Sequence, residues 1–191
     1  MWRRIALPGR KRAINATISS IVESPIRRRN TGDNTPAIVN FKVVPGGKVD
    51  VIVAAKGGGS ENKSKFVMMN PSDSLVDWVL KTVPTMGAGW CPPGMLGIGI
   101  GGTAEKAMLL AKHSLMGAID MAQLKQRGPQ NDIEALRIEL FDKVNALGIG
   151  AQGLGGLSAL VARADAVSTR SRFFWPQLFF DELTSGSTAS M

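Results

Sequence analysis

The sequence has almost none of the side chains that most often carry covalent or proton-transfer chemistry. Its 191 residues include one cysteine, Cys91, one histidine, His113, and no tyrosine. A single cysteine excludes a disulfide within the chain and indicates a reducing compartment. A cysteine nucleophile needs a base beside it, and His113 lies in a predicted helix between a lysine and a serine. We interpret it as a surface residue or one with its hydrogen bonds satisfied, and not as a base, so catalysis by a cysteine–histidine pair is not indicated.

Long apolar runs are also missing. Hydrophobic residues make up 44% of the chain and charged residues 20%, and no apolar run reaches the length of a membrane-spanning helix. This composition is typical of a soluble globular protein with no membrane partner, and the length is sufficient for one sizeable core. We therefore expect a cytoplasmic protein.

Acidic residues are nearly absent from the first 29 positions. Eight basic residues there stand against Glu23, a net charge of +7 that leaves only +1 of the formal +8 for the rest. Proteins that bind nucleic acid usually carry their charge on a folded face interleaved with aromatics, which here are only 6% of the chain. We predict no nucleic-acid partner. The basic start, residues 1–17, predicts a disordered segment or an organelle transit peptide, which would make the protein mitochondrial.

The remaining sequence alternates between strand and helix patterns. Residues 37–44 and 48–55 flank Pro45-Gly46-Gly47 and predict a β-hairpin, and residues 95–100 predict a short buried strand. Apolar residues recur at helical spacing in residues 73–83, 103–115 and 132–147. This mixed order predicts an α/β or α+β domain, with a mixed sheet and packed helices.

Capping residues predict the ends of two of these helices, and the apolar pattern predicts the buried face of one. The first is predicted to begin at Ser72 or Asp73 and to stop at Pro84, and Gly148 is the expected stop of the third. The third helix is predicted to bury one apolar side, formed by Ile133, Leu136, Leu140, Val144 and Leu147.

The composition changes after Leu157. Residues 172–180, RFFWPQLFF, place four phenylalanines and a tryptophan around a proline without clean periodicity. Aromatics packed so closely are more often part of a core or an interface than a binding site, and we expect such a stretch to promote association.

A glycine-rich segment follows the predicted hairpin. Residues 55–64, AKGGGSENKS, place three successive glycines beside Lys56, Ser60, Asn62 and Lys63. Backbone N–H groups of such glycines can approach an anion closely, and the side chains add charge and donors. The spacing does not fit GxxxxGK[ST], so a nucleotide phosphate is not implied. The segment is either an anion-binding loop or a mobile glycine loop.

Residues 97–102, GIGIGG, satisfy the spacing GxGxxG between a predicted strand and a predicted helix. Asp120 follows at about the distance of the acidic residue in a dinucleotide site, but in a stretch that still has a helical pattern. The motif is compatible with a dinucleotide site. Close packing of the helix on the strand explains the glycines at least as well.

Residues 89–94, GWCPPG, surround the single cysteine. Two prolines after Cys91 predict rigid extended backbone, which would hold a thiolate in place for a metal. The competing interpretation is an inert buried cysteine in a packed core.

Four blocks in one order carry a resemblance to a known family. They are RNTGDNTPA, VDVIVAAKGGGSENKS, GAGWCPPGMLGIGIGGTAEKAMLLAK and VNALGIGAQGLGG. Over residues 18–157 the chain resembles the class I, iron–sulfur-dependent fumarases and the related tartrate dehydratase α subunits, and this replaces the dinucleotide interpretation. The resemblance implies a partial catalytic domain at 18–157, cut short at both ends, between the basic start and a divergent, aromatic-rich tail at 158–191.

This family resemblance implies a reversible hydration of fumarate to malate, a reaction of the tricarboxylic acid cycle. Three cysteines of the family hold a 4Fe-4S cluster whose open iron acts as a Lewis acid. Cys91 matches the middle one of these ligands. Gly58, Gly59 and Ser60 match a segment near the substrate, and Arg29 would pair a carboxylate of the small dicarboxylate substrate.

Other family features have no counterpart in this sequence. The family has an upstream cysteine in a CQDTG-like motif, a downstream cysteine near a histidine, and a second domain, so no acid or base residue is identified here. A single thiolate cannot hold the cluster, and we expect this chain alone to hold none. A homo-oligomer, or a second subunit or domain, would complete the site. The alternatives are a tartrate dehydratase α-like lyase and a non-catalytic binding module or remnant.

Overall fold

The computed structural model describes residues 26–30, 40–43, 45–47, 50–52, 63–166, 176–181 and 189–190. The chain divides into two compact units, one formed by Met1–Ala55 with Thr184–Met191 and the other by Lys56–Leu183. In the first unit, the short strands β1 (Asp50–Val51) and β6 (Ala189–Ser190) pair antiparallel. Within the described ranges, no helix is both long and apolar enough to span a bilayer.

The hairpin predicted at 37–44 and 48–55 lies largely outside the described residues. Residues 40–43 form no strand, and Phe41 and Val43 are 83% and 98% exposed. A strand gains most of its stability from packing one face, and these side chains have no such face to cover. The prediction is therefore wrong at the described part of the first strand, while Asp50–Val51 of the second is a strand paired with β6.

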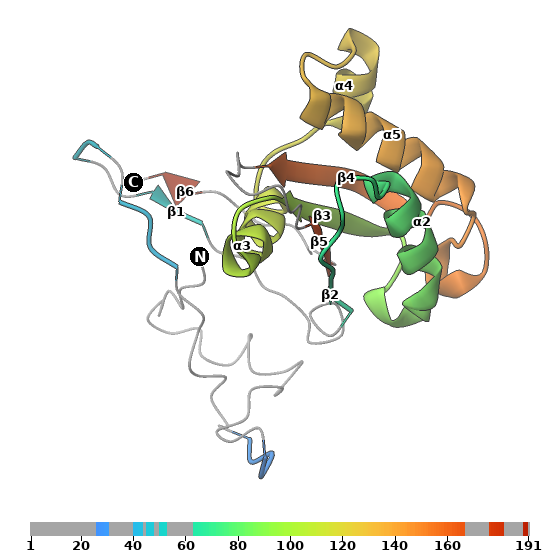
Figure 1. The fold of residues 1–191 in the computed structure, drawn as a ribbon, viewed down its shortest axis with the longest axis horizontal. Helices are drawn as coiled ribbons and strands as arrows, with labels where there is room; N and C mark the ends of the chain where they lie inside the picture. The colour runs from blue at the N-terminus through green and yellow to red at the C-terminus, as the bar shows by residue number, and fades with distance from the viewer. Residues whose placement is uncertain are drawn as a thin grey trace. The chain divides into compact units, whose positions relative to one another are not determined.

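The second unit is built on a four-stranded mixed sheet in the order β2-β5-β3-β4 (Figure 1). The central strand β3 (Gly94–Ile100) pairs parallel with β4 (Ala159–Ala166) and antiparallel with β5 (Pro176–Asp181). The short strand β2 (Lys65–Phe66) pairs antiparallel with β5. The predicted α/β class with a mixed sheet is confirmed, and the strand predicted at 95–100 is β3.

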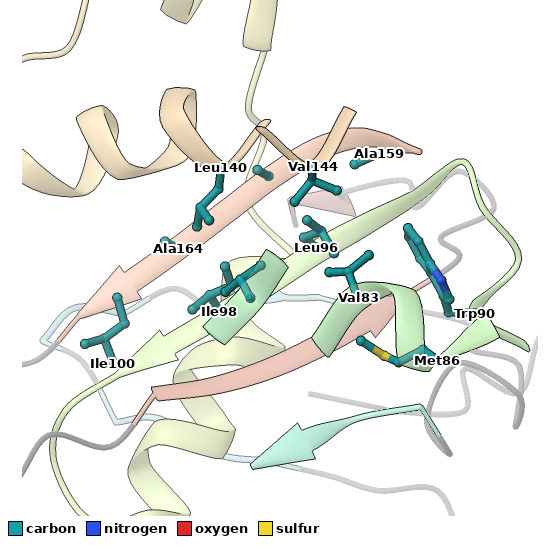
Figure 2. Close-up of a cluster of buried hydrophobic side chains, with 12 residues drawn as sticks. Val83, Met86, Trp90, Leu96, Ile98, Ile100, Leu140, Val144, Ala159 and Ala164 are labelled. Carbon is teal, nitrogen blue, oxygen red and sulfur yellow. The ribbon is translucent and has the colours of Figure 1, made fainter. Parts of the chain in front are cut away.

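Helices cover both faces of this sheet (Figure 1). Alternate residues of β3 face opposite sides. Leu96, Ile98 and Ile100 pack with α2 (Leu75–Thr85) and α5 (Asp132–Ala146) in the main core. Met95 faces α3 (Ala104–Ser114) on the other side. Figure 2 shows the main core, where Val83 of α2 and Leu140 and Val144 of α5 meet β3 over the small side chains of β4.

The helix patterns locate α2, α3 and α5 to within two residues at each end. Ser74 caps α2, because its Oγ accepts the N–H of Asp77 at 3.2 Å, so the helix begins later than predicted. Pro84 lies in its last turn and does not stop it there. Leu147, predicted to be buried, is 37% exposed because the chain turns at Gly148, whose φ is +64°, directly after the helix.

Five α-helices and strands of the described residues were not predicted from the sequence: the short strands β2 and β6, α4 (Met121–Arg127), β4 and β5. Asp120, expected to lie within a helix, is instead the N-cap of α4 and accepts the N–H groups of Ala122 and Gln123. The boundary predicted at Leu157 falls just before β4, which pairs with the central strand. The unit therefore continues past that boundary, and residues of the aromatic segment enter the middle of its sheet as β5.

Arg163 of β4 is a charged side chain buried inside this unit. It is 8% exposed and lies beside Gly97 in the register of the parallel pair. Its Nη1 donates to the carbonyl oxygens of Ser114, at 3.3 Å, and of Leu115. Burial first, and then repulsion from Arg137, lowers the pKa of Arg163. The guanidinium satisfies carbonyls at the negative end of α3, which fixes this helix over the sheet.

Arg127 and Glu134 connect α4 to α5 by a bidentate ion pair. Nη1 and Nη2 of Arg127 donate to Oε2 and Oε1 of Glu134 at 2.8 and 2.7 Å, and the N–H of Gln130 donates to Oε2 at 2.9 Å. The hydrogen bonds from Arg127 are the largest cause that lowers the pKa of Glu134, which falls to about 2.

We expect this pair to make stability depend on acid pH. The pKa of Glu134 is lower in the folded chain than its usual value of about 4.3 in an unfolded one, so the stabilisation is complete above that value and is lost as pH falls toward 2. Glu134→Gln should therefore lower the Tm at pH 7 and lower it much less near pH 2. Glu139→Gln, which removes an exposed pair with Lys143, is the control with the smaller effect at pH 7. An equal loss of Tm from Glu134→Gln at both pH values would contradict this role.

Candidate functional site

Cys91 lies in a tight turn that leads into the central strand. The 3-10 helix η1 (Gly87–Trp90) ends at Cys91, whose φ and ψ are 53° and 57° and whose N–H donates to the carbonyl oxygen of Ala88 at 2.9 Å. Cys91 is half-buried, whereas Trp90 is fully buried beneath the turn. The extended backbone predicted here is therefore wrong. The left-handed conformation arises because Cys91 closes the helical turn before Pro92 takes the chain on toward β3.

A glycine-rich loop, residues 148–156, lies against this turn. The N–H of Gln152, in the short 3-10 helix η2 (Ala151–Gly153), donates to the carbonyl oxygen of Pro92 at 3.3 Å. The N–H of Gly94 donates to the carbonyl oxygen of Ser158 at 3.3 Å. The loop and the cysteine turn are thus connected at the start of the parallel strand pair.

Two polar side chains hold the glycine-rich loop in place. Oδ1 of Asn145 accepts the N–H groups of Ser158 and Ala159, both at 2.9 Å, and its Nδ2 donates to the carbonyl oxygen of Ala159 at 3.1 Å. Oγ of Ser158 accepts the N–H groups of Ile149 at 2.9 Å and Gly150 at 3.4 Å. These side chains accept hydrogen bonds from backbone N–H groups that have no strand partner in the tight loop. The loop is therefore held in one conformation.

The end of a third glycine-rich segment reaches the same turn. The side chain of Lys63 lies so close to Gly89 that a Cβ at this position would overlap it. Lys63 is half-buried and belongs to the segment 55–64. We call the meeting point of Lys63, the turn at residues 89–94 and the loop at residues 148–156 the Cys91 junction. Its segments carry one cysteine, one lysine and one glutamine, Gln152.

The structure describes some of the other predicted site residues and not others. Arg29 is an exposed residue of the first unit, and its proposed contact with a substrate carboxylate stays a prediction. Gly58, Gly59 and Ser60 lie outside the described residues, so their role also stays a prediction. His113 is exposed in the last turn of α3, in agreement with its interpretation as a surface residue.

The glycines of GIGIGG serve helix packing. A Cβ on Gly97 would lie 2.6 Å from the carbonyl oxygen of Ala111, and one on Gly99 would overlap the carbonyl of Ala107 and lie 2.6 Å from the amide nitrogen of Ala111. These two glycines let α3 rest directly on β3, and Gly101 and Gly102, both at positive φ, make the turn between them. Close packing therefore accounts for Gly97 and Gly99, and the turn accounts for Gly101 and Gly102.

The residues present do not make a complete set of ligands for an iron–sulfur cluster. The chain has one cysteine, and the described residues contain no group of three or more His, Cys, Asp or Glu side chains that could hold a metal ion. Cys91 could supply one thiolate, whereas a cubane needs several. Any remaining ligands would have to come from outside these 191 residues.

Sequence reasoning missed Asn145, Ser158 and Gln152. The block VNALGIGAQGLGG was part of the family resemblance, yet no role was given to its polar residues. The available signal was their placement, because they are the polar side chains in and beside a run of glycines that follows a predicted helix.

Known proteins similar to this chain agree on one family. The sequence profile of the fumarate hydratase (Fumerase) family matches residues 14–168, which continues through β4. A protein of Methanocaldococcus jannaschii named "Putative L(+)-tartrate dehydratase subunit alpha" is 41% identical over 133 residues, which are 68% of this chain and 45% of that protein. An L(+)-tartrate dehydratase subunit alpha of Escherichia coli strain UTI89 is 30% identical over 137 residues, 70% of this chain and 43% of that protein.

The match covers most of this chain but less than half the length of either relative. It includes the Cys91 turn, both strands of the parallel pair and the loop that holds Gln152. The chain belongs to the fumarate hydratase (Fumerase) family, as a protein of the class I fumarase and tartrate dehydratase α type.

Proposed function

We propose that this chain is part of a hydro-lyase that reversibly hydrates fumarate to malate. The observation that carries the proposal is the Cys91 junction, where the turn that holds the half-buried Cys91 is contacted by the glycine-rich loop 148–156 and by the side chain of Lys63, in a chain of this family. Arg29, Gly58, Gly59 and Ser60 are the proposed substrate-binding residues, and we expect the protein to act in the cytoplasm.

The cofactor proposed for this reaction is a 4Fe-4S cluster with Cys91 as one ligand. When bound, such a cluster supplies a Lewis-acidic iron. Because the ligands in these 191 residues do not suffice, we propose that a second subunit or domain, or a second copy of the chain, completes the site. The relatives are themselves named as alpha subunits, which supports a partner subunit.

Exposed leucines next to the Cys91 junction support the same partner. Leu154 is 88% exposed in the glycine-rich loop, and Leu157 and Leu160, which follow it, are 49% and 51% exposed. Exposed apolar side chains so close together in the chain are typical of a surface that another polypeptide covers. We propose that the polypeptide with the missing thiolates docks here, which would bring its ligands to Cys91.

L(+)-tartrate is the second candidate substrate, because both relatives named above are tartrate dehydratase subunits. The deciding experiment co-expresses the chain with a polypeptide that carries the two other cysteine motifs of the family. After anaerobic reconstitution with iron and sulfide, loss of fumarate absorbance and formation of oxaloacetate from L-tartrate are measured. Turnover of fumarate supports the first proposal, and turnover of L-tartrate alone replaces it with the second. No turnover of either substrate would favour the non-catalytic module.

A further inference from the structure

Gln152 has an unusual backbone conformation for its residue type. Its φ and ψ are 55° and 20°. The loop at 148–156 reaches positive φ at six positions, and glycine occupies the other five, which are Gly148, Gly150, Gly153, Gly155 and Gly156. A side chain in the left-handed region is strained, and glycine would relieve that strain. Such an outlier, in a loop whose other positive-φ positions are all glycines, points to a use for the side chain.

The position of Gln152 connects it to the cysteine turn. Its N–H donates to the carbonyl oxygen of Pro92, the residue after Cys91, at 3.3 Å, while its side chain is exposed. Asn145 and Ser158 fix the loop on either side of it through their hydrogen bonds. The side chain of Gln152 is therefore attached to a backbone that is already ordered, which reduces the conformational entropy lost when the side chain binds a ligand.

The chemistry of this place favours an anion. Lys63 brings a positive charge to the same turn, because its side chain lies against Gly89. The NH₂ of a glutamine donates two hydrogen bonds, which suits a carboxylate oxygen. We propose that Gln152 binds a carboxylate of the small hydroxy-dicarboxylate substrate at the Cys91 junction. This inference rests on the proposed function for the identity of the ligand.

An NMR titration of the ¹⁵N-labelled full chain with L-malate tests the proposal. In the wild type we expect saturable shifts of the Gln152 side-chain amide and of the loop amides. Gln152→Ala should weaken the affinity about tenfold, the usual effect of losing one hydrogen bond to a charged group. Gln152→Glu keeps the shape but replaces the donors by a charge of the wrong sign, so its loss should be at least as large. Gln126→Ala, at an exposed position of α4, is the matched control and should bind as the wild type does.

Gln152→Gly separates ligand binding from a structural role. Glycine relieves the left-handed strain, so we expect its Tm to rise by about 2–4 °C while the affinity for L-malate still falls about tenfold. A structural role alone would not give these opposite changes. Unchanged affinity in Gln152→Ala and Gln152→Glu, or no saturable shift in the wild type, would overturn the inference.

The two proposals fail in different ways. The first case is a protein, co-expressed with the two other cysteine motifs, that binds L-malate through Gln152 but shows no turnover. This result would support the present inference and refute the proposed function. If the co-expressed protein turns over substrate and its Gln152→Ala variant keeps the wild-type KM and kcat, the proposed function stands and this inference is refuted.

Discussion

Gly99→Ala is expected to lower the free energy of unfolding by about 3 kcal/mol or more, because it places a methyl group where α3 already lies. The added Cβ would overlap the carbonyl oxygen of Ala107 and lie 2.6 Å from the amide nitrogen of Ala111. Both atoms belong to the backbone of α3, so no side-chain rotation can make room. The helix has to shift, which also strains the bond from Arg163 to its C-terminal carbonyls.

Gly117→Ala provides the matched control. Its added Cβ would be 3.9 Å from the carbonyl oxygen of Ser114, an ordinary contact distance, and we expect a change within about 0.5 kcal/mol. Urea unfolding followed by circular dichroism measures both variants. Equal stability of Gly99→Ala and Gly117→Ala would mean that α3 does not rest on β3 as the structure has it.

Cys91→Ala is expected to remove nearly all hydro-lyase activity from the complemented protein, to below about one hundredth of the wild-type kcat. Loss of the groups that support a metal ligand changes activity by about 10–100-fold, and the loss should be larger for Cys91, which we propose as a ligand itself. The fold should persist, because alanine keeps the same left-handed backbone cost and the side chain is only half-buried.

Circular dichroism and the Tm establish whether the Cys91→Ala protein is folded, and the fumarate assay gives its activity. Gln123→Ala, at an exposed position on α4, should leave both values unchanged. A folded Cys91→Ala variant with the full rate would show that this thiol has no part in the reaction.

Local patterns were sufficient to predict most of the helices and the central strand. α3 and α5 carry periodic apolar residues between capping residues, and β3 is a short apolar run between glycines, so their neighbours in sequence determine them. β4, ALVARADA, has small residues and an arginine, and it becomes a strand because β3 lies beside it. β5 depends on pairing with strands far away in sequence, which no local pattern reports.

The candidate site also combines features that local sequence predicts with features that depend on tertiary contacts. Cys91 was identifiable from GWCPPG and the family resemblance, because residue type and motif are local. Its left-handed conformation, the bond from Gln152 to Pro92 and the approach of Lys63 to Gly89 arise only when three distant segments meet. The bonds of Asn145 and Ser158 belong to that tertiary arrangement, and helix periodicity marks Asn145 only as a polar position near the end of α5.

The most direct test of the incomplete-site proposal is an anaerobic reconstitution with iron and sulfide, performed on the chain alone and on the chain co-expressed with the two missing cysteine motifs. A visible spectrum reports the cluster, and loss of fumarate absorbance reports turnover. One thiolate cannot retain a cubane, so we predict no cluster band and no turnover from the chain alone, and both from the complemented protein. A broad cluster band with fumarate turnover by the chain alone would contradict this proposal.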